Sequence, residues 1–191
     1  MKIITWKVKK NHILAVLLAI CMIGYVAAYP SAASAAAKCR PLPIYCVDRD
    51  QKVCSISFDA AWGNEDTQPL IDILGKYNVK ATFFVVGDWV DKYPESVKAL
   101  VDAGHEVMSH SNHHDHFNSL SADQIQKDLK CCNNKIQAIT GVCPTLIRCP
   151  YGEYDDHVIT AIRACGMEPI QWDVEPSAGT ATSRCLSVLQ Q

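Results

Sequence analysis

The sequence predicts an α/β protein in which helices wrap a parallel sheet. Five short segments with strand character alternate with four segments in which apolar residues recur at helical spacing. The connections between them are short, and such alternation is typical either of a barrel or of an open doubly wound sheet. No G-x-G-x-x-G pattern follows the first predicted strand, so a dinucleotide-binding fold has no support in the sequence.

The predicted strands are recognised by alternation or by short apolar runs. Residues 53–58 (VCSISF) alternate apolar and polar side chains, which is typical of a strand with one buried face. Residues 81–86 (ATFFVV) form a short apolar run that fits a strand buried on both faces. The remaining predicted strands are residues 105–110, 145–148 and 168–172.

The predicted helices carry start and stop signals as well as apolar periodicity. Ser121 and Gln124 have the spacing of a capping box in front of the longest helix. Thr67 is the expected cap of the first helix, and Pro69 falls in its first turn. Glycines end three of the helices, as expected from their tolerance of the left-handed conformation. The predicted helices are residues 67–78, 94–104, 120–141 and 155–166.

The first 37 residues have the three parts of a signal peptide. Lysines at positions 2, 7, 9 and 10 precede an uncharged apolar run over residues 13–28, and small residues follow. The run is short for a membrane span, and an uncleaved N-terminal membrane anchor is the alternative. We therefore expect a secreted or cell-envelope protein that contacts a membrane only through an uncleaved N-terminal segment. A lead-in over residues 38–51 then precedes one domain over residues 52–191.

The composition is that of one globular domain with additions. The 191 residues are 49% hydrophobic and 20% charged, and the net charge is -2. This charge offers no electrostatic case for binding nucleic acid or an anionic membrane surface. The ten cysteines contain no C-x-x-C pair, so a structural zinc knuckle is not indicated. Two alternatives remain open for the cysteines: disulfides among Cys39, Cys46 and Cys54, or a fully reduced set of thiols. The sequence does not indicate an oligomeric state.

Polar residues follow four of the five predicted strands. Asp59, His110, Arg148 and Asp173 lie at the carboxyl ends of the first, third, fourth and fifth predicted strands. The carboxyl ends of parallel strands share one edge of the sheet, and active sites are built there. The sequence therefore predicts that these side chains meet and form an active site.

Four of the seven histidines lie in the segment SHSNHHDHFN, residues 109–118. His110 and His114 are four positions apart, which on a helical turn would point both imidazoles the same way. Two histidines and one carboxylate can bind zinc and leave a position open for water. The alternative is a solvated loop, and for His113 and His116 this is the preferred interpretation.

Three motifs in this order resemble those of the polysaccharide deacetylases, the NodB-homology or carbohydrate esterase 4 family. They are SFDAAWGNEDT, which begins at Ser57, HSNHH, which begins at His110, and RCPYG, which begins at Arg148. The resemblance extends from about Val53 to Asp173. The FDAAWG variant is most similar to the sporulation-associated PdaB-like subgroup.

The resemblance implies a distorted (β/α) barrel that removes acetyl groups from N-acetylglucosamine units with the help of a divalent metal, zinc or a similar ion. Asp59 would be the general base that activates the attacking water, and His110 and His114 would be metal ligands. Arg148 would orient Asp59, and the backbone N–H of Tyr151 would stabilise the oxyanion. Amide hydrolysis needs these components: a base, an activated water and stabilisation of the developing negative charge.

The sequence departs from the family pattern at the first motif. The family has two adjacent aspartates there, and the second supplies the third metal ligand, whereas this chain has Ala60. Glu65 and Asp66 are the nearest replacements, and Asp66 is the favoured ligand. The alternative is that both are only an acidic N-terminal cap of the following helix.

The second departure lies after residue 175, where the family has closing strands and a motif with the catalytic acid histidine. No histidine follows His157 in this sequence, so we expect a C-terminally incomplete domain. Three hypotheses follow: a metal-dependent deacetylase, a relative that only binds glycan, and a fragment without a stable fold. The aromatic residues could stack on sugar rings, although core packing is the preferred role for most of them: Trp62, Trp89, Tyr151 and Trp172.

Overall fold

The computed structural model describes residues 16–21 and 40–174, which belong to two compact units, Met1–Arg40 and Pro41–Gln191. In the first unit, residues 16–21 form a short helix, and the rest of the predicted signal peptide lies outside the described residues. Among the helices in the described ranges, none has both the length and the apolar character that a membrane span requires. The second unit carries the sheet and the predicted site.

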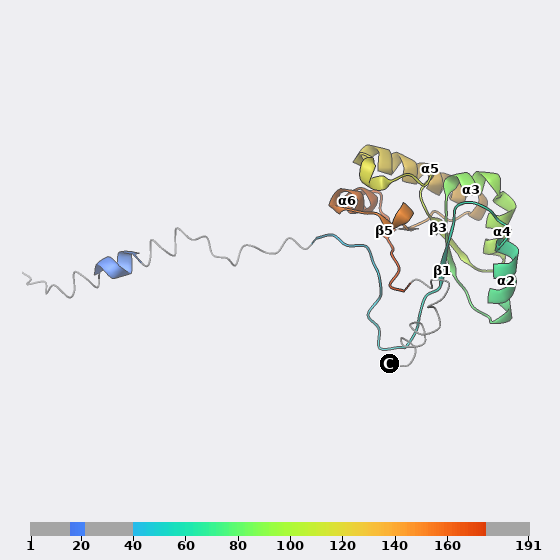
Figure 1. Ribbon diagram of the computed structural model, residues 1–191, viewed down its shortest axis with the longest axis horizontal. Coiled ribbons are helices and arrows are strands. Elements are labelled where there is room, and N and C mark those ends of the chain that lie inside the picture. Colours follow the sequence, from blue (N-terminus) through green and yellow to red (C-terminus); the bar gives the residue numbers. More distant parts are fainter. Residues whose placement is uncertain (1–15, 22–39, 175–191) are drawn as a thin grey trace, which may run out of the picture. The chain divides into compact units, whose positions relative to one another are not determined.

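The core of the second unit is a parallel five-stranded sheet with the order β1-β2-β3-β4-β5 (Figure 1). Each strand pairs with the next one in sequence, which is the order of a (β/α) barrel. A doubly wound sheet would reverse its order at a switch point. Over the described residues the sheet is open, so the predicted barrel is incomplete. The strands are β1 (Ser57–Ala60), β2 (Thr82–Val85), β3 (Glu106–Ser109), β4 (Leu146–Ile147) and β5 (Glu168–Pro169).

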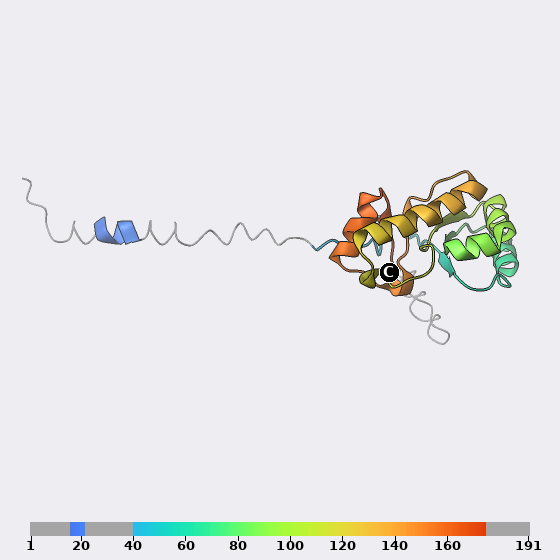
Figure 2. The same cartoon turned by 90° about the horizontal axis from the view of Figure 1, so that it is seen from above.

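The helices connect these strands and lie in an arc outside them, with α5 running across the others in the view from above (Figures 1 and 2). Helix α5 packs on β3 and against α3, α4 and α6. Buried side chains between sheet and helices include Phe83, Val85, Leu100, Ile136 and Ile162. The helices are α2 (Thr67–Lys76), α3 (Gly87–Lys92), α4 (Pro94–Asp102), α5 (Ala122–Thr140) and α6 (Asp156–Ala164).

The terminal signals of the longest predicted helix are confirmed. Ser121 caps α5: its hydroxyl accepts from the backbone N–H of Gln124, and the side-chain oxygen of Gln124 accepts from the backbone N–H of Ser121. Gly141 ends the helix with φ +74°, the left-handed conformation that glycine adopts without a steric penalty. Both ends of α5 are therefore encoded locally.

Several predicted boundaries are wrong. Strand β1 covers residues 57–60 instead of 53–58, because its pairing with β2 begins at Ser57 opposite Thr82. The cap of α2 is Asp66, and its side chain makes no capping hydrogen bond, so Thr67 is the first helical residue rather than the cap. Helix α3 was not predicted, since six residues are too few for a periodic apolar pattern.

Part of the lead-in segment extends the sheet. Ile44 forms a parallel bridge with Ile170, in which its N–H donates to Pro169 at 2.9 Å and its carbonyl accepts from Gln171 at 2.8 Å. These bonds satisfy backbone groups at the β5 edge that would otherwise be unpaired. Every cysteine in the described part of the chain is a free thiol, including Cys46 and Cys54; Cys39 lies outside it.

Candidate functional site

The carboxyl edge of the sheet bears a cavity of about 650 Å³, whose lining includes Asp59, His110, His114 and Tyr151. Cavities of this size are typical of small-molecule sites. The prediction that residues from the ends of separate strands meet here is confirmed for β1, β3 and β4 by direct contacts. Asp173 is the exception, since its exposed side chain does not line the cavity.

Arg148 connects β4 to β1 beneath the cavity. Its Nη1 donates to Oδ1 of Asp59 at 2.8 Å, and its Nη2 donates to Oγ of Ser57 at 2.7 Å. The guanidinium is buried, 4.3 Å from the ring centroid of Phe84 and 5.6 Å from that of Trp172. Two donors and two aromatic contacts fix the guanidinium plane, so Asp59 is held in one orientation.

His110 presents a nitrogen lone pair towards Asp59. Its Nδ1 lies 2.7 Å from the carbonyl oxygen of Arg148, and a carbonyl can only accept, so Nδ1 carries the proton. The unprotonated Nε2 of the neutral ring lies 3.8 Å from Oδ2 of Asp59. Burial lowers the pKa of His110 because the imidazolium loses its hydration, although Asp59 acts in the opposite direction. The ring is therefore neutral near pH 7, the state in which a histidine binds a metal.

His114 converges on His110, but the local structure is not the predicted helical turn. Ser111 and His114 have φ values of 72° and 61°, and the segment between them is a loop. The N–H of His114 donates to Oγ of Ser111 at 2.9 Å, so the hydroxyl supports the turn. The two imidazole centroids are 4.9 Å apart. The expected convergence is thus achieved by left-handed backbone rather than by helical periodicity.

The environment of His114 leaves one ring nitrogen available. Its Nδ1 is buried and has no hydrogen-bond partner within the described residues. Burial lowers the pKa of this imidazole, with Asp59 again opposing the effect. A buried polar atom without a partner costs free energy unless a ligand satisfies it. His110 Nε2 and His114 Nδ1 therefore fit the donor set of a zinc-like ion.

The histidine loop is held by residues that the sequence analysis did not identify. The N–H of Asn112 donates to Oδ1 of Asp128 in α5 at 2.8 Å. The N–H groups of Gly87 and Asp88, in the first turn of α3, donate to the carbonyl oxygens of Ser111 and Asn112, each at 3.0 Å. Burial raises the pKa of the Asp128 carboxyl. Asp128 lies on the apolar-to-polar boundary of its helix, and no local pattern distinguishes it from a surface residue.

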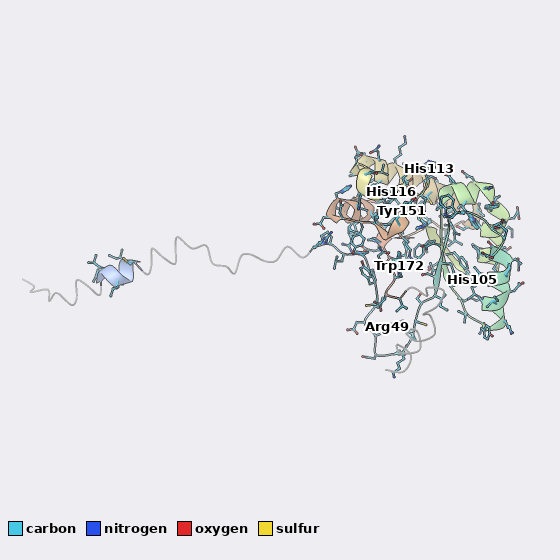
Figure 3. All side chains as sticks on the ribbon, viewed as in Figure 1. Arg49, His105, His113, His116, Tyr151 and Trp172 are labelled. Carbon is cyan, nitrogen blue, oxygen red and sulfur yellow. The ribbon has the colours of Figure 1, made fainter. Side chains whose placement is uncertain are left out.

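The other two histidines of the cluster bind neighbouring carboxylates. His113 is exposed, and its Nδ1 lies 2.8 Å from Oδ2 of Asp88. His116 lies 2.9 Å from Oε2 of Glu153 through Nδ1, and its ring stacks on Tyr151 at 4.1 Å between centroids (Figure 3). His113 therefore points away from the cavity as predicted, whereas His116 supports one of its walls.

Of the three histidines outside the cluster, His105 and His157 lie in the described part of the chain, and both have structural roles. His105 is buried against the ring of Phe83, and its Nδ1 accepts from the N–H of Ala81 at 3.2 Å. His157 lies in α6 with Nε2 2.9 Å from the carbonyl oxygen of Leu120. Neither residue lines the cavity.

Tyr151 adopts a left-handed conformation with φ 58°, uncommon for a residue with a large side chain. Gly152 follows with φ 66°, and a Cβ on it would lie 2.8 Å from Cη2 of Trp172. Its carbonyl accepts from Nε2 of Gln171 at 2.8 Å. Such strain persists where the surrounding structure holds it, and it clusters at functional sites. The backbone of Tyr151 is thus fixed at the cavity, as an oxyanion-binding amide requires.

The predicted third ligand, Asp66, lines the same cavity, as do Ala60 and Glu65. The Asp66 carboxylate makes no capping hydrogen bond to α2, so it is not used as a hydrogen-bonding cap. In the part of the chain that the structure describes, no three histidine, cysteine, aspartate or glutamate side chains are grouped closely enough to hold a metal ion. The ligand role of Asp66 stays a prediction.

The preferred core role for the aromatic residues is wrong for most of them. Only Trp89 is buried, and its Nε1 donates to the carbonyl oxygen of Gly63 at 2.7 Å. Trp62 and Tyr151 are 76% and 55% exposed, and both line the cavity together with Trp172. Three of the four aromatic side chains are therefore available to a ligand.

Comparison with known proteins identifies relatives over this part of the chain. The polysaccharide deacetylase family matches residues 47–170. The peptidoglycan-N-acetylmuramic acid deacetylase PdaA of Bacillus subtilis is 33% identical over 131 residues, which are 68% of this chain and 50% of PdaA. The peptidoglycan-N-acetylglucosamine deacetylase PgdA of Listeria monocytogenes is 32% identical over 145 residues, 73% of this chain and 30% of PgdA. The chain spans half or less of the length of these relatives.

Solved structures give the same result for the fold. A carbohydrate esterase family 4 pseudoenzyme from Bacillus anthracis superposes with a TM-score of 0.67 at 36% identity, covering 70% of this chain and 48% of that one. The structure of PdaA from Bacillus subtilis superposes with a TM-score of 0.65 at 32% identity, covering 69% and 57%. The similar structures thus include both a named deacetylase and a pseudoenzyme.

Proposed function

Since the chain belongs to the polysaccharide deacetylase family, we propose that it hydrolyses N-acetyl groups of an N-acetylglucosamine-containing polysaccharide such as peptidoglycan or a chitin-like glycan. The single observation that carries the proposal is the contact of Arg148 with Asp59 beside the histidine pair. This arrangement places a carboxylate base and two neutral imidazoles at one cavity. The names of the relatives divide between N-acetylglucosamine and N-acetylmuramic acid, so relationship alone does not choose the sugar.

In the proposed reaction Asp59 accepts the proton of the attacking water. Arg148 keeps the carboxylate turned towards the cavity, because its guanidinium donates to Oδ1 and leaves Oδ2 facing His110. The fixed N–H of Tyr151 donates to the oxygen of the acetyl group as negative charge develops there. Asp59 thus acts on the attacking water, and the N–H of Tyr151 acts on the oxygen of the acetyl group.

The histidine pair would hold a divalent metal, most readily zinc. His110 and His114 fit because both line the cavity and each has a ring nitrogen without a hydrogen-bond partner among the described residues. Asp66 is proposed as the third ligand. When bound, such an ion lowers the pKa of water and polarises the acetyl oxygen. The chain itself contributes the orientation of the two rings through Arg148 and Ser111.

The alternative function is glycan binding without hydrolysis. The specific observation in its favour is Ala60, which lines the cavity where the family motif has its metal-binding aspartate. The similarity to a pseudoenzyme agrees with this alternative. Three aromatic side chains line the cavity, and two of them, Trp62 and Tyr151, are exposed; they would serve binding in either case.

The proposed setting is outside the cytoplasmic membrane, at the cell wall. It is supported by the signal-peptide pattern of the first 37 residues and by the peptidoglycan named in the relatives' descriptions. A role in sporulation is proposed only from the resemblance of the FDAAWG motif to the PdaB-like subgroup.

The experiment that separates the two functions measures acetate released from N-acetylglucosamine oligomers by the whole chain. The protein is first depleted of metal and then supplied with zinc. A deacetylase releases acetate only after zinc is added, and its Asp59→Asn variant releases none. Binding of the oligomer without acetate release by the zinc-loaded protein would select the binding function instead.

A further inference from the structure

A short part of the lead-in, residues 42–45, is bound along the edge of β5, and we call it the strap. The N–H of Ile44 donates to the carbonyl oxygen of Pro169 at 2.9 Å. The carbonyl oxygen of Ile44 in turn accepts from the N–H of Gln171 at 2.8 Å. The strap precedes residues 47–170, which match the family, so the family motifs do not include it.

Side chains hold both ends of the strap. At one end, Arg163 of α6 donates from Nη2 to the carbonyl oxygen of Leu42 at 3.0 Å and from Nε to Oε2 of Glu168 in β5 at 3.1 Å. At the other end, the hydroxyls of Tyr45 and Tyr154 form a hydrogen bond at 2.5 Å, in which either can donate. The strap is therefore bound to α6, to β5 and to the segment that follows the third motif.

Gln171 connects the strap to the wall of the cavity. Its backbone N–H is bound to the strap, while the N–H of the preceding Ile170 donates to the carbonyl oxygen of Ile147 in β4 at 2.7 Å. The Gln171 side chain is buried, and its Nε2 donates to the carbonyl oxygen of Gly152 at 2.8 Å. A Cβ on Gly152 would lie 3.1 Å from this nitrogen, so Gln171 packs directly against the residue that follows Tyr151.

We infer that the strap positions Tyr151, the residue whose N–H is proposed to bind the oxyanion. The inference rests on the proposed function and adds three positioning residues to it: Ile44, Tyr45 and Gln171. Tyr151 has φ 58°, a conformation that a bulky residue keeps where the neighbouring structure holds it. An oxyanion donor must be in place before the charge develops. Loss of the strap should therefore destabilise the transition state more than the bound substrate.

Hydrogen exchange of the metal-free whole chain tests this connection without substrate. The N–H groups of Gly152 and Glu153 donate to carbonyl oxygens within their own loop, each at 3.1 Å, so their protection reports how often the loop opens. Ile44→Pro removes one backbone hydrogen bond to β5, and exchange at both amides is expected to become about 10-fold faster. Val47→Pro is the matched control. Val47 is 71% exposed, and its N–H makes no backbone hydrogen bond within the described part of the chain, so exchange should stay unchanged.

Kinetics of the zinc-loaded chain on N-acetylglucosamine oligomers test the positioning role. Ile44→Pro is expected to lower kcat by about 10-fold, with little change in KM or in zinc affinity. Tyr45→Phe, which removes a hydroxyl group alone, should lower kcat by a smaller factor. Gln171→Met removes the donor to Gly152 and should lower kcat at least as far as Ile44→Pro does. Combining Ile44→Pro with Gln171→Met should lower kcat no further than Gln171→Met alone, because both act through one connection.

The exchange and kinetic results can each overturn the inference. Unchanged exchange at residues 152 and 153 in both Ile44→Pro and Tyr45→Phe overturns it, as does a fall in kcat that is additive in the combined variant. Should Ile44→Pro fail to fold, exchange in Tyr45→Phe decides the question. Failure of every form, wild type included, to release acetate refutes the proposed activity alone. The exchange measurement uses no substrate, so it still decides whether the strap holds the loop.

Discussion

Arg148 holds Asp59 with its side chain and His110 with its backbone. Its Nη1 lies 2.8 Å from Oδ1 of Asp59, and its carbonyl oxygen lies 2.7 Å from Nδ1 of His110. The three residues come from the ends of β4, β1 and β3, so parallel pairing of the strands is what brings them together. One residue thus sets the orientation of the proposed base and the tautomer of the proposed ligand.

Arg148→Lys should separate these two roles. A lysine ammonium cannot donate to both Asp59 and Ser57 in the fixed fork of the guanidinium, so Asp59 loses its orientation. We expect kcat on N-acetylglucosamine oligomers to fall by about 100-fold. The carbonyl group at position 148 remains, so zinc affinity and KM should change little. An unchanged kcat would show that the Arg148 side chain does not position the base.

His114→Ala and His113→Ala form a matched pair on the same loop. His114 has a buried ring nitrogen without a described partner, whereas His113 is exposed and bound to Asp88. Outer residues around metal sites change affinity by about 10- to 100-fold, so loss of a ligand should exceed that range. We expect His114→Ala to lose zinc affinity by more than 100-fold and His113→Ala to retain it, as measured by competition with a chromophoric chelator. Equal losses in the two variants would remove His114 from the proposed ligand set.

Asp128 is expected to act on the site through the histidine loop. Its carboxylate accepts from the N–H of Asn112, which lies between the two proposed ligands and is buried. In Asp128→Ala this N–H loses its acceptor, which should lower the free energy of unfolding by about 1–3 kcal/mol. Zinc affinity should fall by about 10-fold.

Asp128→Asn is the control for this prediction. Its side-chain oxygen can still accept from Asn112, so zinc affinity should recover most of the loss seen with alanine. If alanine and asparagine weaken zinc binding equally, the hydrogen bond to Asn112 is not what positions the loop.

The first turn of α6 predicts a pH dependence of stability. Asp155 accepts from the N–H groups of Val158 and His157 at 3.0 and 2.9 Å, and Nδ1 of His157 lies 2.6 Å from its Oδ1. The bond from Val158, followed by the contacts with His157, lowers the pKa of Asp155. Because the pKa is lower in the folded state, the stabilisation is complete above the ordinary value of 3.8 and is lost as pH falls through the folded pKa. Asp155→Ala should therefore lower the free energy of unfolding by about 1 kcal/mol at pH 7 and by progressively less in acid.

Asp155→Asn separates the cap from its titration. Asparagine caps helices about as well as aspartate but does not ionise, so its stability should match the wild type at pH 7 and lack the loss in acid. Urea unfolding of the three proteins at several pH values measures both effects. A constant difference between wild type and alanine variant down to pH 2 would contradict the assignment.

The sequence predicted the parts of the fold that are encoded locally. The capping box of Ser121 and Gln124 and the glycine at position 141 specify α5 within a few residues, and both were confirmed. The start of β1 depends on where its partner strand begins, so alternation in residues 53–58 placed it too early. Pairing between strands is a property of the folded sheet and leaves no local signal.

The same distinction applies to the site. Strand ends identified Asp59, His110 and Arg148, because a parallel sheet collects them at one edge. The predicted helical turn between His110 and His114 was wrong. The spacing of the histidines does not reveal that Ser111 and His114 adopt left-handed φ values. Asp128 was missed because its function depends on burial against a loop sixteen positions away, and burial of a lone aspartate opposes every sequence-based expectation.

Mass spectrometry of an N-acetylglucosamine tetramer incubated with the zinc-loaded chain tests whether the chain is a deacetylase. We expect stepwise loss of acetyl groups from the tetramer, and no loss with Asp59→Asn or with wild-type protein in excess chelator. An intact tetramer after prolonged incubation with folded, zinc-loaded wild-type protein would contradict the proposed deacetylase. Loss of acetyl groups at the same rate with Asp59→Asn would contradict the site.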